Sequence, residues 1–364
     1  MHALTKDALN DKSLLTIDDV AEAAGVSRST VSLVLRNSPL VAARTNEKVR
    51  EAIARLGYVY NRKAAIRARL SYLIGVIIPD LSNPFFSDLA AGIDSVLNDE
   101  GWVSLVGNCW ESAAKQDLII QRMQEHKVDG LLICPAVDSG KGFAERLEQT
   151  GFPVLQVLRR LGSNSDNYLG VDYSQGVSLA VDHLWSLGHT DIAFLGAAPH
   201  HSAATERRQG FEAAMKRHGL EPRYKACELT RSGGASAVGE LYAQPGAPSA
   251  LVCFNDIVAL GAMAGLDRIG KRVGTDVSVV GFDNVPEAAF VRPALTTIDS
   301  NARQLGAEAA KLMLTSVKDG VRAAVDAPMP TRFVLRETTG PAHQTSTEAR
   351  SSLLTPVSFS SSAK

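Results

Sequence analysis

Two kinds of hydrophobic pattern divide the chain. Near the N-terminus, apolar residues recur at helical spacing in three short segments, Ile17–Ala24, Arg28–Leu35 and Thr45–Leu56. From Tyr72 onward, short apolar runs typical of buried strands alternate with longer helical patterns. Such alternation predicts parallel sheets covered by helices on both faces. The pattern therefore predicts an all-α head followed by an α/β core.

The first two predicted helices are joined by a turn that suits a helix-turn-helix motif. Thr16 can cap the first helix, and Ser27 can cap the second. Ala21, Gly25 and Val31 have the required spacing: a small residue where the helices cross, a glycine in the turn and a branched residue that locks the second helix. A three-helix domain without a DNA role is the alternative interpretation of this pattern.

In the core, the alternation of strands and helices runs twice, first from YLIGVIIPD and again from YLGVD. Two series of comparable length predict two doubly wound subdomains, which bind ligands beyond the carboxyl ends of their strands. Carboxylates, amides, one arginine and aromatic rings occur at these places, a mixture that suits a small hydroxyl-rich molecule. Each of them alone is also compatible with a helix cap or a surface polar group. The residues concerned are Asp80, Asn83, Phe85, Phe86, Asp172, Arg207, Asn255, Asp256, Asp283 and Asn284.

The distribution of charge separates the head from the core. The 364 residues have a net charge of −1, but residues 16–70 contain two Lys and eight Arg against two Asp and three Glu, which gives +5. Residues 1–15 are neutral, so the remainder carries −6. A basic head on an acidic core predicts a polyanionic partner for the head only.

Several classes of protein are disfavoured. No apolar run reaches the roughly 18 residues that cross a membrane, and no export signal begins the chain. The four cysteines lie far apart without metal-binding spacing, which predicts reduced thiols in the cytoplasm. No nucleotide-binding glycine loop or Gly-x-Ser-x-Gly elbow occurs, and His200–His201 is interpreted as a solvated loop pair. We therefore expect no enzyme activity, no cofactor and no metal.

Longer segments resemble a known family. TIDDVAEAAGVSRSTVSLVL, RTNEKV and AIARLGYVYNRKAA are similar to the lactose-repressor (LacI) family of bacterial transcription regulators, and STVSLVL and NR-x-A resemble its maltose-regulon repressor branch. GHTDIAFLG, RRQGF, CFND-x-x-A-x-G, VSVVGFDN and LTTID match in the same order, so the resemblance covers about Thr16 to Thr339. It implies a core of the type I periplasmic-binding-protein kind. It also implies a homodimeric repressor that a small, sugar-like effector releases from a pseudo-palindromic operator in double-stranded DNA.

The resemblance also implies roles for individual residues. The second helix would enter the major groove, where Arg28, Ser29 and Leu33 would meet base edges. A linker helix would enter the minor groove; the family's usual leucine position is Arg67 here, so Ile66 is the expected apolar lever. The alternative is that this linker contacts phosphates only. Expected phosphate contacts are Thr16, Ser27, Thr30, Asn37 and Arg62. Expected effector contacts are Asn83, Phe85, Phe86, Asp172, Arg207, Asn255 and Asp283.

These interpretations divide the chain into parts. We expect a flexible extension at 1–15, a helix-turn-helix domain at 16–60, a hinge at 61–71, a core at 72–340 and a disordered tail at 341–364. The first subdomain would comprise about 72–172 and 301–321, and the second 173–300 and 322–340, with chain crossings near Asp172, Ser300 and Val321. A solute sensor without operator recognition and an architectural DNA-bending protein are the alternative functions.

Overall fold

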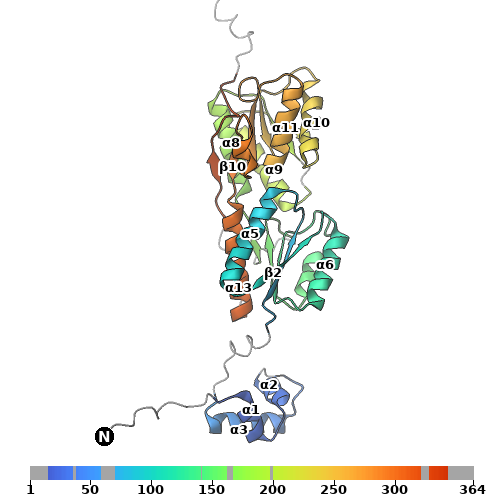
Figure 1. Cartoon of the computed structure of the whole chain (residues 1–364), viewed down its shortest axis with the longest axis vertical. Coiled ribbons are helices and arrows are strands. Elements are labelled where there is room, and N and C mark those ends of the chain that lie inside the picture. Colours follow the sequence, from blue (N-terminus) through green and yellow to red (C-terminus); the bar gives the residue numbers. More distant parts are fainter. Residues whose placement is uncertain are drawn as a thin grey trace, which may run out of the picture. The chain divides into compact units, whose positions relative to one another are not determined.

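The computed structural model describes residues 15–35, 38–58, 70–140, 142–161, 167–196, 200–320 and 328–342. The chain forms two compact units, Met1–Arg69 and Leu70–Lys364 (Figure 1). The predictions for Asn37, Arg62, Ile66, most of the hinge and most of both terminal segments lie outside the described residues. Within the described residues, no helix combines the length and the apolar character needed to cross a membrane.

Three helices form the described part of the head: α1 (Ile17–Ala24), α2 (Arg28–Leu35) and α3 (Ala43–Leu56). Thr16 caps α1 in a capping box: its hydroxyl accepts from the Asp19 N–H, and its own N–H donates to the Asp19 carboxylate. Gly25 has the left-handed conformation, with φ of 63°, that a turn directly after a helix requires. The two predicted helices of the motif are thus confirmed residue for residue.

The head's core consists of small and branched side chains from all three helices. Val20, Val31 and Val49 are fully buried, and Val34 and Ala52 pack beside them. The predicted start of the third helix was two residues late, because α3 begins at Ala43 rather than Thr45. No side chain caps α3 at this end.

The first lobe of the core is built on a parallel five-stranded sheet. Residues of β1 alternate between its faces: Ile74, Val76 and Ile78 join the cluster that contains α5 and α13, while Ile77 joins the cluster that contains α6 and α7. The sheet is therefore covered on both sides. In spatial order, its strands are β2 (Val103–Asn108), β1 (Leu73–Ile78), β3 (Gly130–Ile133), β4 (Val154–Val157) and β5 (Tyr168–Leu169). Its helices are α5 (Pro84–Asp99), α6 (Ala113–Glu125), α7 (Phe143–Glu148) and α13 (Ala302–Asp319).

The second lobe is built on a six-stranded sheet that is parallel except for its last strand. A side chain at Gly281 would strike Asp256 of α11, whereas Phe282 meets Gly176 of α8, so these two helices cover opposite faces. In spatial order, its strands are β11 (Arg332–Val334), β10 (Thr296–Asp299), β9 (Ser278–Asp283), β8 (Ala250–Cys253), β6 (Ile192–Gly196) and β7 (Arg223–Ala226). Its helices are α8 (Tyr173–Ser186), α9 (Ser202–Arg217), α10 (Arg231–Tyr242), α11 (Asp256–Arg268) and α12 (Glu287–Phe290).

The chain passes between the lobes more than once. After β10 it returns to the first lobe as α13, which lies beside α5 (Figure 1). The close approach depends on glycine: a Cβ at Gly92 would lie 2.0 Å from the Arg303 carbonyl, and one at Gly306 would lie 2.1 Å from that of Leu89. β11 then pairs antiparallel with β10 in the second lobe. Two doubly wound, mostly parallel sheets with a helical head confirm the predicted fold class.

Candidate functional site

In the head, the residues expected to meet DNA lie at the start of α2. Arg28 and Ser29 are exposed, and the nearest acid to Arg28 is Asp18 of α1, at 3.4 Å between Nη1 and Oδ2. Both side chains of this pair are more than 60% exposed, so the ion pair contributes little and can be exchanged for another anion. Leu33, on the following turn, is half-buried.

Hydroxyl groups cluster at the same helix end. Ser27 accepts from the Thr30 N–H at 3.2 Å, which confirms it as the cap of α2. Its Oγ also lies 2.7 Å from Ser29 Oγ and 2.8 Å from Thr30 Oγ1. Thr16 is exposed, with its hydroxyl donating to Asp19. A helix N-terminus surrounded by hydroxyls and an arginine is suited to phosphate oxygens and base edges.

In the second lobe, two of the predicted effector contacts meet. Arg207 of α9 and Asp283 at the end of β9 are both about nine-tenths buried, and Arg207 Nη2 lies 3.7 Å from Asp283 Oδ1. This separation is too long for a hydrogen bond. The Nε of Arg207 is buried without a partner among the described residues. The pair therefore keeps hydrogen-bonding capacity for a further molecule.

Aromatic rings surround the Arg207 guanidinium. Its central carbon lies 4.0 Å from the ring centre of Tyr173, 4.4 Å from that of Phe282 and 4.5 Å from that of Phe254. Burial raises the pKa of the Asp283 carboxyl well above its usual range; the charge on Arg207 opposes this shift and nearby Asp256 adds to it. The rings fix the direction of the guanidinium and exclude water from it.

Asp256 supports the backbone that carries Asp283. Asp283 and Asn284 both have positive φ, 112° and 60°, which is a strained conformation for residues other than glycine. Asp256 is fully buried and accepts from the Val285 N–H at 2.8 Å and from the Thr297 hydroxyl at 2.5 Å. Burial raises its pKa to about 7. Asp256 is therefore a positioning residue for the turn after β9.

Three other predicted contacts are engaged as helix caps. Asn83 accepts from the Phe85 N–H, Asp172 from the Gln175 N–H and Asn255 from the Val258 N–H. Phe85 is buried in the core, and Phe86 packs edge-on against it with ring centres 5.3 Å apart. Among the described residues, no hydrogen bond or ion pair joins Asn83 or Asp172 to Arg207 or Asp283. Effector contact by these five residues stays a prediction.

Contacts between the lobes occur beside this pair. The Tyr173 hydroxyl donates to the Leu158 carbonyl at 3.2 Å. The Arg160 N–H donates to the Ser202 hydroxyl at 3.0 Å, and its guanidinium lies 3.1 Å from the Glu206 carboxylate. Glu206 directly precedes Arg207 on α9, and the Tyr173 ring lies against the Arg207 guanidinium, so two of these contacts adjoin the buried pair.

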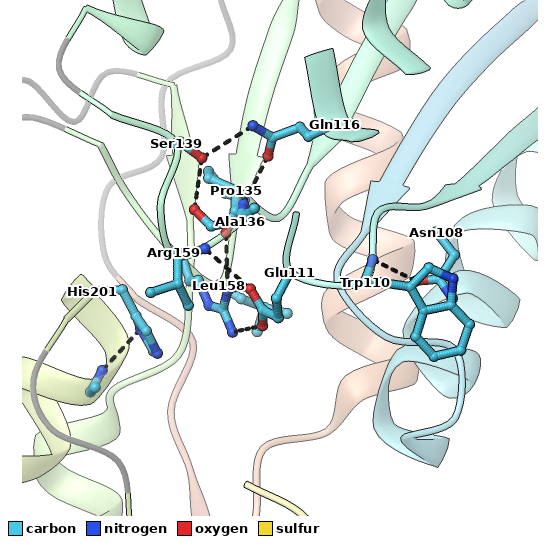
Figure 2. A network of polar contacts seen from close by, with 12 residues as sticks. Asn108, Trp110, Glu111, Gln116, Pro135, Ala136, Ser139, Leu158, Arg159 and His201 are labelled. Carbon is cyan, nitrogen blue, oxygen red and sulfur yellow. Dashed lines mark hydrogen bonds and ion pairs between the residues drawn. The ribbon is translucent and has the colours of Figure 1, made fainter. Parts of the chain in front are cut away.

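Sequence reasoning missed a second ion pair, on the first lobe, between a buried arginine and a glutamate whose side chain is 40% exposed. Arg159, two residues after the end of β4, donates from both terminal nitrogens to Glu111, each bond being 2.8 Å long (Figure 2). The prediction for His201 was also wrong: it is half-buried and caps α9, its Nδ1 accepting from the Ala204 N–H at 3.2 Å. Their positions in the sequence could have pointed to both residues: Arg159 follows an apolar strand, and His201 precedes a helix.

A helix-turn-helix head on a core of two parallel-sheet lobes defines a class of DNA-binding regulator. Residues 16–61 match the model for bacterial regulatory proteins of the lacI family, and residues 181–339 match the periplasmic binding protein-like domain. The HTH-type transcriptional repressor PurR of Vibrio vulnificus is 32% identical over 336 residues, which cover 89% of this chain and 98% of that protein. The protein belongs to the lacI family of bacterial regulatory proteins.

Solved structures agree with this assignment. The lac repressor dimer bound to operator and the anti-inducer ONPF matches with a TM-score of 0.68 and 30% identity, covering 90% of this chain and 99% of that one. A LacI family transcriptional regulator from Enterococcus faecium with bound ribose matches with a TM-score of 0.68 and 28% identity, covering 74% and 100%. The protein is a DNA-binding transcription regulator; the maltose-regulon branch stays a prediction.

Proposed function

We propose that this protein is a homodimeric repressor that releases a pseudo-palindromic operator when a small polar effector, a carbohydrate or a close derivative, binds between its lobes. It acts in the cytoplasm and catalyses no reaction. The observation that carries the proposal is the buried Arg207–Asp283 pair, enclosed by three rings, in the same chain as an exposed helix-turn-helix.

The proposed DNA contacts begin with the exposed end of α2. Arg28 pairs with a guanine edge, Ser29 and Leu33 contact neighbouring bases, and the hydroxyls of Thr16, Ser27 and Thr30 position the head on phosphates. The basic charge of the head supports this role. Asn37 and Arg62 are proposed as further phosphate contacts and Ile66 as the minor-groove lever.

The proposed dimer has support on the first lobe. β2 is an edge strand, and Val103 and Val106 on it are 54% and 45% exposed. Exposed apolar side chains on an unpaired edge suit a second copy of the chain. Two heads then read the two halves of a palindrome, because the two-fold symmetry of the dimer is repeated in the site.

Binding at the pair is coupled to the DNA through the arrangement of the lobes. An effector that contacts Arg207 and Asp283 together with the first lobe changes how the lobes fit, and so changes the separation of the two heads. Such coupling is reciprocal, so operator DNA weakens effector binding by the same factor that the effector weakens DNA binding. In this scheme, Asn255, Asp172, Asn83, Phe85 and Phe86 complete the effector site.

Fluorescence anisotropy of the full chain tests the proposal. Labelled duplexes selected from randomised palindromes are titrated with and without a panel of sugars and sugar derivatives. We expect nanomolar-range binding to at least one palindrome and its loss with at least one solute. Failure to bind any palindrome would favour a solute sensor, binding that no solute alters would favour an architectural role, and tighter binding with a solute would replace release by corepression.

A further inference from the structure

The first lobe holds a guanidinium whose orientation is fixed before any ligand arrives. Arg159 is 9% exposed and donates from Nη1 and Nη2 to the two oxygens of Glu111, and from Nη1 to the Pro135 carbonyl at 3.0 Å. Three bonds to two different segments define the plane of the group. A buried arginine held in this way presents its remaining N–H groups in one direction.

The partner of Arg159 is itself held by a strained and well-bonded loop. Trp110 and Glu111 have φ of 52° and 53°, a conformation that residues other than glycine rarely adopt and that clusters at binding sites. The Val137 N–H donates to Glu111 at 3.1 Å. Gln116, fully buried, accepts from the Ala136 N–H at 2.8 Å and donates to Ser139 at 3.1 Å (Figure 2).

One edge of Arg159 remains without a partner. Glu111 occupies the edge formed by the two terminal nitrogens, so the edge formed by Nε and Nη2 is left, and no described residue accepts from it through a hydrogen bond. Two parallel N–H groups on such an edge match the spacing of two oxygens in a carboxylate or phosphate. Figure 2 shows Arg159 between Glu111 on one side and His201 on the other.

His201 of the second lobe is a further donor near Arg159, whose charge acts on its ring (Figure 2). Because its Nδ1 accepts from the Ala204 N–H, the proton of the neutral ring lies on Nε2, which is therefore a donor. Burial, together with the nearby cations Arg159 and Arg207, lowers the pKa of His201 to about 3. The ring is thus a neutral donor in a region where two guanidinium groups produce a positive potential.

We propose that Arg159 and His201 bind an anionic oxygen group of the effector, a carboxylate or a phosphate, and that the effector is therefore an acidic sugar derivative rather than a neutral sugar. The inference rests on the proposed function and deepens it. Arg207 and Asp283 hold the hydroxyl-bearing part from the second lobe, while Arg159 holds the anionic group from the first. One effector then contacts both lobes, as closure requires.

Isothermal titration calorimetry of the full chain tests the inference. The carboxylate probes are gluconate and glucuronate, the phosphate probes are glucose 6-phosphate and ribose 5-phosphate, and the neutral parents are glucose and ribose. We expect one anionic class to bind about 10- to 100-fold more tightly than its parent, as charge-assisted bidentate bonds contribute. Which class it is distinguishes a carboxylate from a phosphate.

Two disruptive variants, one conservative variant and one control test whether the preference for an anionic effector arises at Arg159 and His201. Arg159→Gln combined with Glu111→Gln removes the charge without leaving a carboxylate unpaired, and His201→Asn retains a capping side chain but removes the ring. Both variants are expected to lose the preference for the anion, with far-ultraviolet circular dichroism as the check on folding. Arg159→Lys, which keeps the charge without the planar edge, is the conservative variant and retains part of the preference. Arg146→Gln, an exposed arginine of the same lobe, is the matched control and keeps it.

The results that would contradict this inference differ from those that would contradict the proposed function. Neutral parents that bind as tightly as the anions, or a preference that survives Glu111→Gln/Arg159→Gln, would overturn the inference and leave the proposed repressor intact. If no solute binds and none alters operator binding, both this inference and the effector part of the proposed function fail.

Discussion

The head and the second lobe hold their key arginines in opposite surroundings. Arg28 and Asp18 in the head are 3.4 Å apart and both more than 60% exposed, whereas Arg207 and Asp283 are 3.7 Å apart and more than nine-tenths buried. Water screens the first pair, so its charges are separated at little cost. The second pair has lost its hydration, so each charge depends on its surroundings.

This difference separates two kinds of functional residue. In the head, a side chain such as Arg28 can exchange its partner for DNA without disturbing the three-helix core. In the second lobe, Arg207 packs against three rings that also belong to the core. Changes in the head should therefore alter binding alone, whereas changes in the lobe should alter binding and stability together.

The largest effect is expected from Arg207→Ala. Removing one partner leaves Asp283 buried and uncompensated, and breaking such a pair costs about 3–5 kcal/mol of unfolding free energy. The effector response should disappear, while operator affinity without effector stays as in the wild type. Urea denaturation and anisotropy with the selected operator measure the two quantities.

The neighbouring Arg208→Ala is the matched control. Arg208 is 45% exposed and pairs with Glu212 at 2.8 Å on the same helix, so its loss should change stability by only about 0.5 kcal/mol. Loss of DNA binding by a folded Arg207→Ala protein would contradict the separation of the two sites. Equal effects of the two alanine variants would show that burial is not what distinguishes Arg207.

The next largest effect is the pH dependence of stability that Asp256 causes. Burial raises the pKa of Asp256 in the folded state to about 7, from an ordinary value of 3.8, so the folded state holds the proton more strongly than the unfolded state does. The contribution of this proton to the free energy of unfolding is fully present below about pH 4. It is lost as the pH rises towards 7, by up to about 1.4 kcal/mol per pH unit. Between pH 5 and 7, the wild type should therefore lose up to about 2–3 kcal/mol relative to Asp256→Asn.

Urea unfolding of both proteins at several pH values checks this difference. His201 has a lowered pKa and contributes with the opposite sign, but it is present in both proteins and cancels in the comparison. Parallel stability profiles for the wild type and Asp256→Asn would mean that Asp256 does not take up a proton in this range.

A smaller effect, confined to binding, is expected from Arg28→Ala. If Arg28 pairs bidentately with one guanine, operator affinity should fall by about 1–3 kcal/mol and discrimination should relax at a single base position. The unfolding free energy of the head should not change, since both members of its ion pair are exposed. Competition binding with single-base variants of the operator measures this. A uniform loss across all sequences would identify Arg28 as a phosphate contact instead.

The head and the core also differ in how much of their structure could be predicted from the sequence. In the head, the determinants are local: Thr16, Gly25 and Ser27 act on backbone groups within a few residues, so α1 and α2 were predicted residue for residue. The start of α3 was missed because its first turn has no side-chain cap, and the good helix formers Ala43 and Arg44 extend it.

In the core, strands and the residues after them could be predicted, but contacts between distant segments could not. Asp283 was selected because it ends an apolar strand, and Arg207 because it lies in the helix after DIAFLG, within the RRQGF segment that resembles the family. The three rings around Arg207 come from α8, the end of β8 and β9, and nothing in their spacing shows that they meet. Arg159 and Glu111 lie 48 residues apart, and their pairing depends on the strand order of the first sheet.

The smallest predicted effect compares two threonines of the head. Thr16 caps α1 through its hydroxyl, whereas Thr45, where the third helix was predicted to begin, lies inside the first turn of α3. Thr16→Ala should cost about 1 kcal/mol of unfolding free energy, as the loss of an N-cap does, and Thr45→Ala should cost close to nothing because alanine is the better helix former. Thermal denaturation of the head, followed by its own transition in the full chain, measures both. A larger loss from Thr45→Ala than from Thr16→Ala would mean that the Thr45 hydroxyl caps α3 and that the helix begins after Thr45.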